Sequence, residues 1–225
     1  MPATYVVTGA NRGIGLELAR QLKERGEEVV ATARRPGEAA ELGSLGVRVE
    51  PLDVADGESA GAFAAALEGT PVDVLINNSG YAGDRRPLEE LDLESMRACF
   101  EVNCVGALRL VRLLLPNLRA GSTRLIAQMT SRMGSLADNG SGGAYPYRTS
   151  KAALNMVHRS LSVDLAPEGF RCVTLHPGWV QTDMGGSSAP VSVEQSVAGL
   201  LRVLDGLEPA DSGGFLDFRG EPVPW

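Results

Sequence analysis

Short runs of apolar and β-branched residues alternate along the chain with longer stretches whose apolar residues recur every three or four positions. The short runs predict seven strands, at residues 4–8, 28–33, 47–54, 72–78, 122–131, 171–178 and 213–218. The periodic stretches predict helices at residues 13–25, 60–67, 93–115, 146–165 and 192–205. We expect Pro116 to end the long middle helix, because proline lacks the N–H that continues a helix and its ring clashes with the preceding turn.

This alternation is typical of α/β proteins, in which helices cover both faces of a parallel sheet. Continuous apolar strands fit burial on both sides. We therefore predict a doubly wound Rossmann fold, with a single parallel sheet of about seven strands and helices on both faces. The chain has 225 residues and shows no repeat, linker or low-complexity tract, so we expect a single domain over residues 1–225. The Gly- and Ser-rich loops 134–144 and 183–190 follow strands and should border the ligand site.

Composition excludes several classes of function. A formal net charge of −7 without a basic stripe argues against a nucleic-acid partner. The N-terminus lacks the basic and apolar regions of a secretory signal, and no apolar stretch is long enough to form a transmembrane segment, so we expect a cytoplasmic protein. The three cysteines show no CxxC spacing and the two histidines stand alone, so we expect no metal site.

A glycine-rich turn, "TGANRGIG" (8–15), follows the first predicted strand and begins the first predicted helix. Its glycines are Gly9, Gly13 and Gly15. Glycine lets the backbone approach a pyrophosphate closely, and a helix N-terminus offers it free N–H groups and partial positive charge. In this strand–turn–helix context the turn predicts a dinucleotide-binding site.

The residues after the second strand indicate which dinucleotide binds. Arg34 and Arg35 stand where an acidic residue would bind a ribose 2′-hydroxyl, and Arg12 lies inside the glycine turn. Arg12 and Arg34 suit a 2′-phosphate, which arginine binds through paired donors, so we expect NADP(H) in preference to NAD(H). We expect Arg35 to be solvated. Asp53, after the third strand, is placed either to bind the adenine amino group or to cap its own loop.

A tyrosine and a lysine stand four residues apart in the segment "GGAYPYRTSKAAL" (142–154). Residues i and i+4 share one face of a helix, so Tyr147 and Lys151 should lie one turn apart, whereas Tyr145 is paired with the uncharged Thr149. A phenol has a pKa of about 10 and is a weak acid–base catalyst at neutral pH. A neighbouring ammonium group stabilises the phenolate and lowers that pKa. The pair alone is common by chance.

The order of the motifs is more specific than any one of them. The glycine turn is followed by "NNSG" (77–80), Asn103, Ser131, the Tyr147/Lys151 pair and "PGWVQTDM" (177–184). Over essentially the whole chain this order resembles the short-chain dehydrogenase/reductase family. The resemblance implies a seven-stranded Rossmann sheet and a Ser–Tyr–Lys–Asn tetrad.

The resemblance assigns a role to each member of the tetrad. Tyr147 would be the general acid/base, and Ser131 would orient the substrate oxygen. Lys151 would lower the tyrosine pKa and bind the nicotinamide ribose, and Asn103 would hold a water that relays protons. The interval between Ser131 and Tyr147 is longer than is usual in the family, which makes Ser135 an alternative. We prefer Ser131 because it ends a strand.

The glycine turn and the resemblance together imply a set of cofactor contacts in the turn and after several strands. These residues are Gly9, Asn11, Arg12, Gly13, Ile14, Gly15, Arg34, Asp53, Val54, Asn78, Ser79, Gly80, Tyr147, Lys151, Pro177, Gly178, Val180 and Thr182. Asn77 would steady the central strand. An apolar substrate pocket is predicted from Tyr81, Leu136, Tyr145, Trp179 and Met184. Arg85 and Arg86 would either attract an acidic or phosphorylated substrate or remain solvated.

Several segments are similar to two groups within the family. They are "TSRMGSLA", "SKAALNMVHRS", "HPGWVQTDMGG" and "PVPW". Likeness to sniffer-type carbonyl reductases implies an NADPH-dependent enzyme acting on a small carbonyl or alcohol. The stronger likeness to bacterial C-factor proteins implies a signalling or cofactor-sensing protein, or an enzyme acting on a phospholipid headgroup alcohol. The family also implies a homodimer or homotetramer. The physiological substrate and the direction of reaction stay open.

Overall fold

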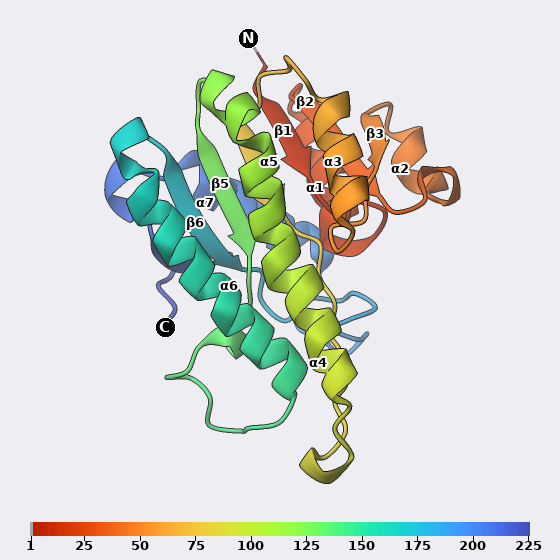
Figure 1. Cartoon of the computed structure of the whole chain (residues 1–225), viewed down its shortest axis with the longest axis vertical. Helices are drawn as coiled ribbons and strands as arrows, with labels where there is room; N and C mark the ends of the chain where they lie inside the picture. The colour runs from red at the N-terminus through yellow and green to blue at the C-terminus, as the bar shows by residue number, and fades with distance from the viewer. Residues whose placement is uncertain (1) are drawn as a thin grey trace.

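A seven-stranded parallel sheet forms the centre of the protein, seen in a computed structural model that describes residues 2–225 (Figure 1). Its strand order is β3-β2-β1-β4-β5-β6-β7. The strands are β1 (Thr4–Val7), β2 (Glu28–Ala33), β3 (Arg48–Pro51), β4 (Val74–Asn77), β5 (Leu125–Met129), β6 (Arg171–His176) and β7 (Gly214–Asp217). This confirms the predicted Rossmann fold. The chain reverses its direction across the sheet between β1 and β4, and in such sheets ligands bind at the carboxyl ends of the strands at this point.

Helices cover both faces of this sheet, with α3, α5 and α6 in front and α1 and α7 behind in the view of Figure 1, whereas α4 lies below the ends of the strands. The helices are α1 (Gly13–Glu24), α2 (Ala40–Ser44), α3 (Gly57–Ala66), α4 (Leu93–Phe100), α5 (Gly106–Ala120), α6 (Tyr145–Asp164) and α7 (Val193–Asp205). The short α2 escaped prediction, because five residues carry too little periodicity to mark a helix. Among residues 2–225, no helix is both long and apolar enough to cross a membrane.

Two apolar cores lie on the two faces of the sheet, because successive strand residues point to opposite sides. Val7 and Ile76 face the core that includes Leu18 and the helices behind the sheet, whereas Val6 and Leu75 face the core under α3 and α5. Both sets are almost completely buried, which explains why the strands read as continuous apolar runs.

The predicted middle helix, 93–115, differs from the structure in two ways. It is interrupted after α4 by one π-helical turn, Glu101–Val105, before α5 continues the same direction. Pro116 lies inside α5, and the helix ends at Ala120, so the predicted stop at Pro116 is wrong. Leu114 and Leu118 are fully buried on either side of the proline. Burying two such side chains contributes about 3–6 kcal/mol, which offsets the roughly 3 kcal/mol that an internal proline costs.

Several strands are shorter than predicted at their carboxyl ends. The third ends at Pro51 rather than at residue 54, the fifth at Met129 rather than at 131, and the sixth at His176 rather than at 178. The residues just beyond these ends leave the strand ladders and form loops at one edge of the sheet. These loops contain several of the predicted site residues, among them Asp53, Ser131 and Thr182.

Candidate functional site

The glycine turn between β1 and α1 has the backbone geometry that the sequence predicts. Gly9 and Gly13 adopt left-handed conformations, with φ of 64° and 53°. A Cβ atom on Gly15 would lie 2.3 Å from the Gly9 carbonyl oxygen and 2.6 Å from Nδ2 of Asn78, so only glycine fits there. The side chain of Arg12 does not cap α1, and the first turn of α1 carries no acidic residue. The N–H groups at this helix end therefore suit an anion.

The "NNSG" segment after β4 is joined directly to this turn. The side-chain amide of Asn78 donates to the carbonyl oxygens of Thr8 and Gly9, at 2.9 and 3.2 Å. In return, the Thr8 hydroxyl accepts hydrogen bonds from the backbone N–H groups of Asn78 and Ser79, both at 2.9 Å. Two segments separated by about 70 residues thus form one rigid unit at the switch point of the sheet.

The predicted 2′-phosphate ligands have different surroundings. Arg34 is exposed and forms no ion pair with any residue that the structure describes. Arg35 is also exposed and pairs with Glu38 at 2.8 Å. Arg12 pairs with Asp183 at 2.8 Å, and both side chains are largely exposed. The sequence contains no local signal for this last contact, because Asp183 comes from the loop after β6.

The same loop also packs on the glycine turn. A Cβ atom on Gly13 would lie 3.3 Å from Cγ2 of Thr182, a predicted cofactor contact. Thr182, with Asp183 paired to Arg12, therefore brings the loop after β6 against the start of α1.

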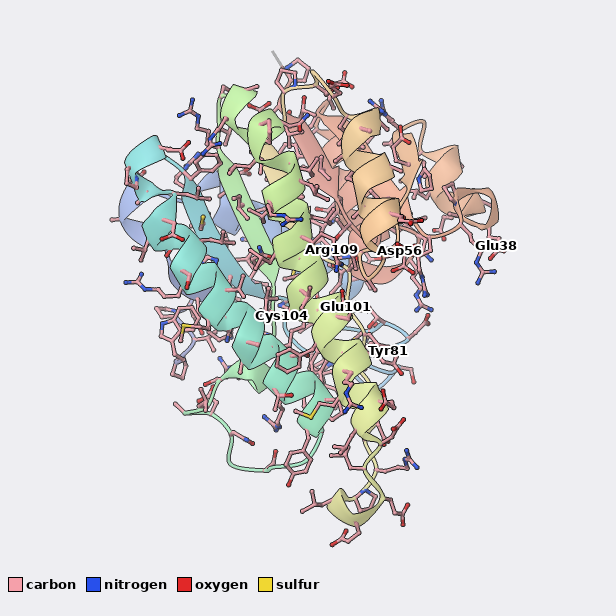
Figure 2. The ribbon with its side chains drawn as sticks, viewed as in Figure 1. Glu38, Asp56, Tyr81, Glu101, Cys104 and Arg109 are labelled. Atoms are coloured by element: carbon pink, nitrogen blue, oxygen red, sulfur yellow. The ribbon has the colours of Figure 1, made fainter. Side chains whose placement is uncertain are left out.

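The loop after β3 is held against α5. The Asp53 carboxylate accepts a hydrogen bond from the Ala55 N–H at 3.0 Å, which is the loop-capping alternative considered for it. The Arg109 guanidinium donates to the Val54 carbonyl oxygen at 2.5 Å and to the Glu101 carboxylate at 2.6 Å (Figure 2). Arg109 is thus a positioning residue that sequence reasoning missed.

Three predicted catalytic residues meet where β5 ends beneath α6. Lys151 is almost completely buried, and its Nζ donates to the Met129 carbonyl oxygen at 2.7 Å. The same Nζ lies 5.7 Å from the centre of the Tyr147 ring, so the two side chains share one face of α6. The Ser131 side chain lies near enough to the Tyr147 phenol to lower its pKa against the larger effect of burial, which raises it. An acid–base group, a hydroxyl group and an ammonium group are therefore gathered at this point.

The pKa of the phenol differs from the expectation drawn from the Tyr–Lys spacing. Burial raises the pKa of Tyr147 to about 12, although the Ser131 side chain and the charge of Arg85 act in the opposite direction. Burial also lowers the pKa of Lys151 to about 8. In the protein alone, desolvation of the phenol thus outweighs any stabilisation of the phenolate by nearby cations.

Asn103 lies in the π-helical turn and uses its whole side-chain amide in hydrogen bonds within the protein. Its Oδ1 accepts from the Tyr81 N–H at 2.7 Å, and its Nδ2 donates to the Tyr81 carbonyl oxygen at 2.8 Å and the Ser150 hydroxyl at 2.9 Å. A Cβ atom on Gly80 would lie 3.5 Å from Asn103 Oδ1 and 3.9 Å from Lys151 Nζ. The Asn103 amide therefore joins the loop after β4 to α6 beside the lysine.

The alternative serine, Ser135, has a structural position. It is almost fully buried, donates to the Trp225 carbonyl oxygen at 3.3 Å and accepts from the Asp138 N–H at 3.0 Å. The Ser131 hydroxyl instead accepts from the Met133 N–H at 3.1 Å and also lies near the phenol. The geometry favours Ser131 for the catalytic role.

The side chains predicted to line the substrate pocket are all exposed and apolar. They are Tyr81, Leu136, Tyr145, Trp179 and Met184. Arg86 pairs with Asp84 at 2.9 Å, whereas Arg85 is exposed and close enough to Tyr147 for its charge to act on the phenol.

Two surface cavities of the described residues differ in their relation to the predicted site. The first, of about 240 Å³, opens at the ends of β6 and β7 and is lined by Arg132, His176, Gly178, Trp179, Val191, Asp217, Phe218 and Arg219. The second, of about 300 Å³, lies along α4 and contains none of the predicted site residues.

Comparison with known proteins agrees with this architecture. A family model described as short chain dehydrogenase matches residues 3–191. The chain is 56% identical to the C-signal of Myxococcus xanthus over 164 residues, which cover 73% of this chain and 99% of that relative. The carbonyl reductase Sniffer of D. melanogaster superimposes with a TM-score of 0.95 at 34% identity, with both chains fully covered. An NADPH-bound carbonyl reductase from chicken fatty liver gives a TM-score of 0.93 at 36% identity, again over both whole chains.

Proposed function

This chain belongs to the short-chain dehydrogenase family, and we propose that it is an NADPH-dependent oxidoreductase that acts on a small carbonyl or alcohol substrate. The observation that carries the proposal is the meeting of Ser131, Tyr147 and Lys151 at the carboxyl end of β5. That edge of the sheet also holds the glycine turn, so a substrate and a dinucleotide would meet there.

The residues at this edge of the sheet fit a dinucleotide. The close approach at Gly15 and the free N–H groups of α1 suit a pyrophosphate. Exposed Arg34, without an ion-pair partner among residues 2–225, suits a 2′-phosphate, and the chicken relative's bound NADPH supports the same preference. Arg12 would contribute once its contact with Asp183 opens. When bound, the cofactor supplies the hydride.

The chain's own residues would handle the proton. With a raised pKa, the Tyr147 phenol is protonated at neutral pH and is ready to donate to a carbonyl oxygen. The Ser131 hydroxyl would orient that oxygen, and the phenolate left after donation has the Lys151 ammonium group as its neighbour. A protonated phenol supports the direction of carbonyl reduction, because oxidation of an alcohol requires it to start as a base.

Oxidation of NADPH in the presence of a panel of aldehydes and ketones tests this function. We expect turnover with stoichiometric formation of alcohol, and a loss of about 10²–10⁴-fold in kcat for Tyr147→Phe. The variant should still bind NADPH, because the phenol hydroxyl does not shape the glycine turn. Binding of NADPH without reduction of any carbonyl, or full activity in Tyr147→Phe, would contradict the proposal.

A second candidate function follows from the identity to C-signal. In this alternative the fold and its cofactor act as a signal or sensor, or the enzyme acts on a phospholipid headgroup alcohol. The buried Lys151 beside Tyr147 favours catalysis, because a protein that only binds has no evident need for a desolvated ammonium group there. If Tyr147→Phe abolishes turnover but keeps the biological effect, the signalling function is the correct one.

A further inference from the structure

The cavity of about 240 Å³ lies beyond the carboxyl ends of β6 and β7, next to the loop that carries Ser131. Arg132, which follows Ser131, lines it together with Arg219, which follows β7. His176, the last residue of β6, and the exposed indole of Trp179 also line it. Because ligands of a doubly wound sheet bind at this edge, the cavity is placed for the part of a substrate that lies away from the nicotinamide.

The polar groups that remain free in this cavity are hydrogen-bond donors. The buried carboxylate of Asp217 already accepts from the Arg219 guanidinium and from the N–H groups of Arg219 and Glu221. Arg132 is held only loosely, with its Nε 3.5 Å from the nearest Asp138 carboxylate oxygen, beyond ordinary hydrogen-bond length. Its guanidinium can therefore turn towards a ligand.

The imidazole of His176 adds a neutral group to these donors. Burial and the charges of Arg132 and Arg219 lower its pKa to about 4, against the opposing effect of Asp217. Both guanidinium groups line the same cavity as this ring. Its Nδ1 is buried and has no hydrogen-bond partner in the described part of the chain. A buried polar atom without a partner is costly, and this one is covered by protein rather than open to the cavity.

We propose that this cavity binds a carboxylate carried by the substrate, so that the preferred substrates are carbonyl compounds with a carboxylate group. Arg132 supplies the paired donors that a carboxylate matches. Trp179 and Phe218 pack on the apolar chain that joins the carboxylate to the carbonyl. Glu221 is well exposed, so solvent screens its repulsion. The inference rests on the proposed reductase function and specifies its substrate class.

A series of straight-chain aldehydes that end in a carboxylate, each compared with its methyl ester, tests this inference. The reacting group is the same within each pair, so the ratio of kcat/KM reports recognition of the carboxylate alone. We expect a wild-type preference for the best acid of about tenfold or more, which Arg132→Gln removes and Arg132→Lys partly restores. The control Arg86→Gln removes a guanidinium that is paired with Asp84 outside the cavity, and should leave the preference unchanged.

Equal kcat/KM for acids and esters in the wild-type protein would overturn the inference. The inference would also be overturned if Arg85→Gln lost the preference for acids and Arg132→Gln kept it. The carboxylate would then bind near Arg85 and not in this cavity. Turnover of the esters shows the reductase function independently of either result. If no carbonyl is reduced, the reductase function fails, and the cavity is tested alone by following benzoate binding through tryptophan fluorescence. Benzoate binding by the wild-type protein that is lost in Arg132→Gln would support the carboxylate site. The absence of benzoate binding would overturn it.

Discussion

The two halves of the sheet build their parts of the site by different means. The glycine-turn half (β1 to β4 with α1) depends on the absence of side chains, since Gly15 leaves no room for a Cβ and Asn78 bonds the backbone of the turn. The catalytic half (β5 to β7 with α6) depends on buried polar side chains. Lys151 bonds a strand carbonyl, and Asn155 joins Thr130 to α6 through a hydrogen bond of 2.7 Å.

This difference determines how each half responds to change. Close backbone contacts depend on shape and are insensitive to pH. Desolvated ammonium, phenol and imidazole groups depend on charge, and their stability and chemistry change with pH. Larger side chains should therefore disrupt the close backbone contacts of the first half. A change of pH should instead alter the stability and chemistry of the second half.

The largest expected effect is a steric one in the glycine-turn half. Gly15→Ala places a methyl group 2.3 Å from the Gly9 carbonyl oxygen, so the turn must move and NADPH affinity should fall about 100-fold or more. Gly43→Ala is the matched control, because a Cβ there meets nothing within 4 Å and the helical position favours alanine. Titration of both variants with NADPH, followed by its fluorescence, measures the difference. Equal affinities would show that the turn does not approach the pyrophosphate.

The next prediction concerns the choice of dinucleotide. Arg34→Gln removes an exposed guanidinium and should weaken NADPH binding about 10–100-fold, the usual range for lost charge-assisted bonds. NADH has no 2′-phosphate, so its affinity should change little. Arg35→Gln, which removes a guanidinium already paired with Glu38, serves as the control. Tighter binding of NADH than NADPH by the wild-type protein would contradict the assignment.

A pH effect is expected in the catalytic half, which contains both histidines of the chain. Burial lowers the pKa of His158 from 6.5 to about 4, so between these values the unfolded chain binds more protons than the folded one. The free energy of unfolding should therefore fall as the pH falls through this window, by up to about 3 kcal/mol for a shift of this size. Urea unfolding of wild type and His158→Phe measures it. His176 has a similar shift, so the variant should keep part of the slope, and an unchanged slope would contradict the prediction.

The smallest expected effect concerns the contact between the two halves. The pair of Arg12 and Asp183 is largely exposed, so it should contribute less than about 1 kcal/mol to stability. Asp183→Asn frees Arg12 and should tighten NADPH binding a few-fold while leaving the melting temperature nearly unchanged. Weaker NADPH binding in Asp183→Asn would show instead that the ion pair holds the loop in its binding position.

In both halves, the sequence predicts local patterns better than it predicts contacts between distant segments. The glycine turn, the seven strands and the Tyr147–Lys151 pair are local patterns, and the structure has the predicted strands, turn geometry and i+4 pairing. The contacts that the sequence did not indicate join distant segments, such as Trp225 with Ser135 and Arg109 with Val54. Such pairs depend on tertiary packing and have no fixed spacing.

Other differences between the sequence predictions and the structure arise where burial outweighs the local preference of a residue. The buried leucines on either side of Pro116 continue α5 through a residue that usually ends a helix. For the phenol, spacing indicated the neighbour of Tyr147, but the sign of its pKa shift depends on how deeply the hydroxyl is buried. Depth of burial is a property of the folded protein that no sequence motif reports.

The central claim is that Tyr147 holds its proton in the protein alone and exchanges it once a positively charged nicotinamide lies beside it. An ultraviolet difference titration of wild type against Tyr147→Phe, with and without NADP⁺, measures this directly between about pH 7 and about pH 11. We predict that without NADP⁺ this tyrosine stays largely protonated across the range, since its pKa is raised to about 12. With NADP⁺ it should ionise below the value of free tyrosine, about 10. The same titration curve in both conditions would contradict the account.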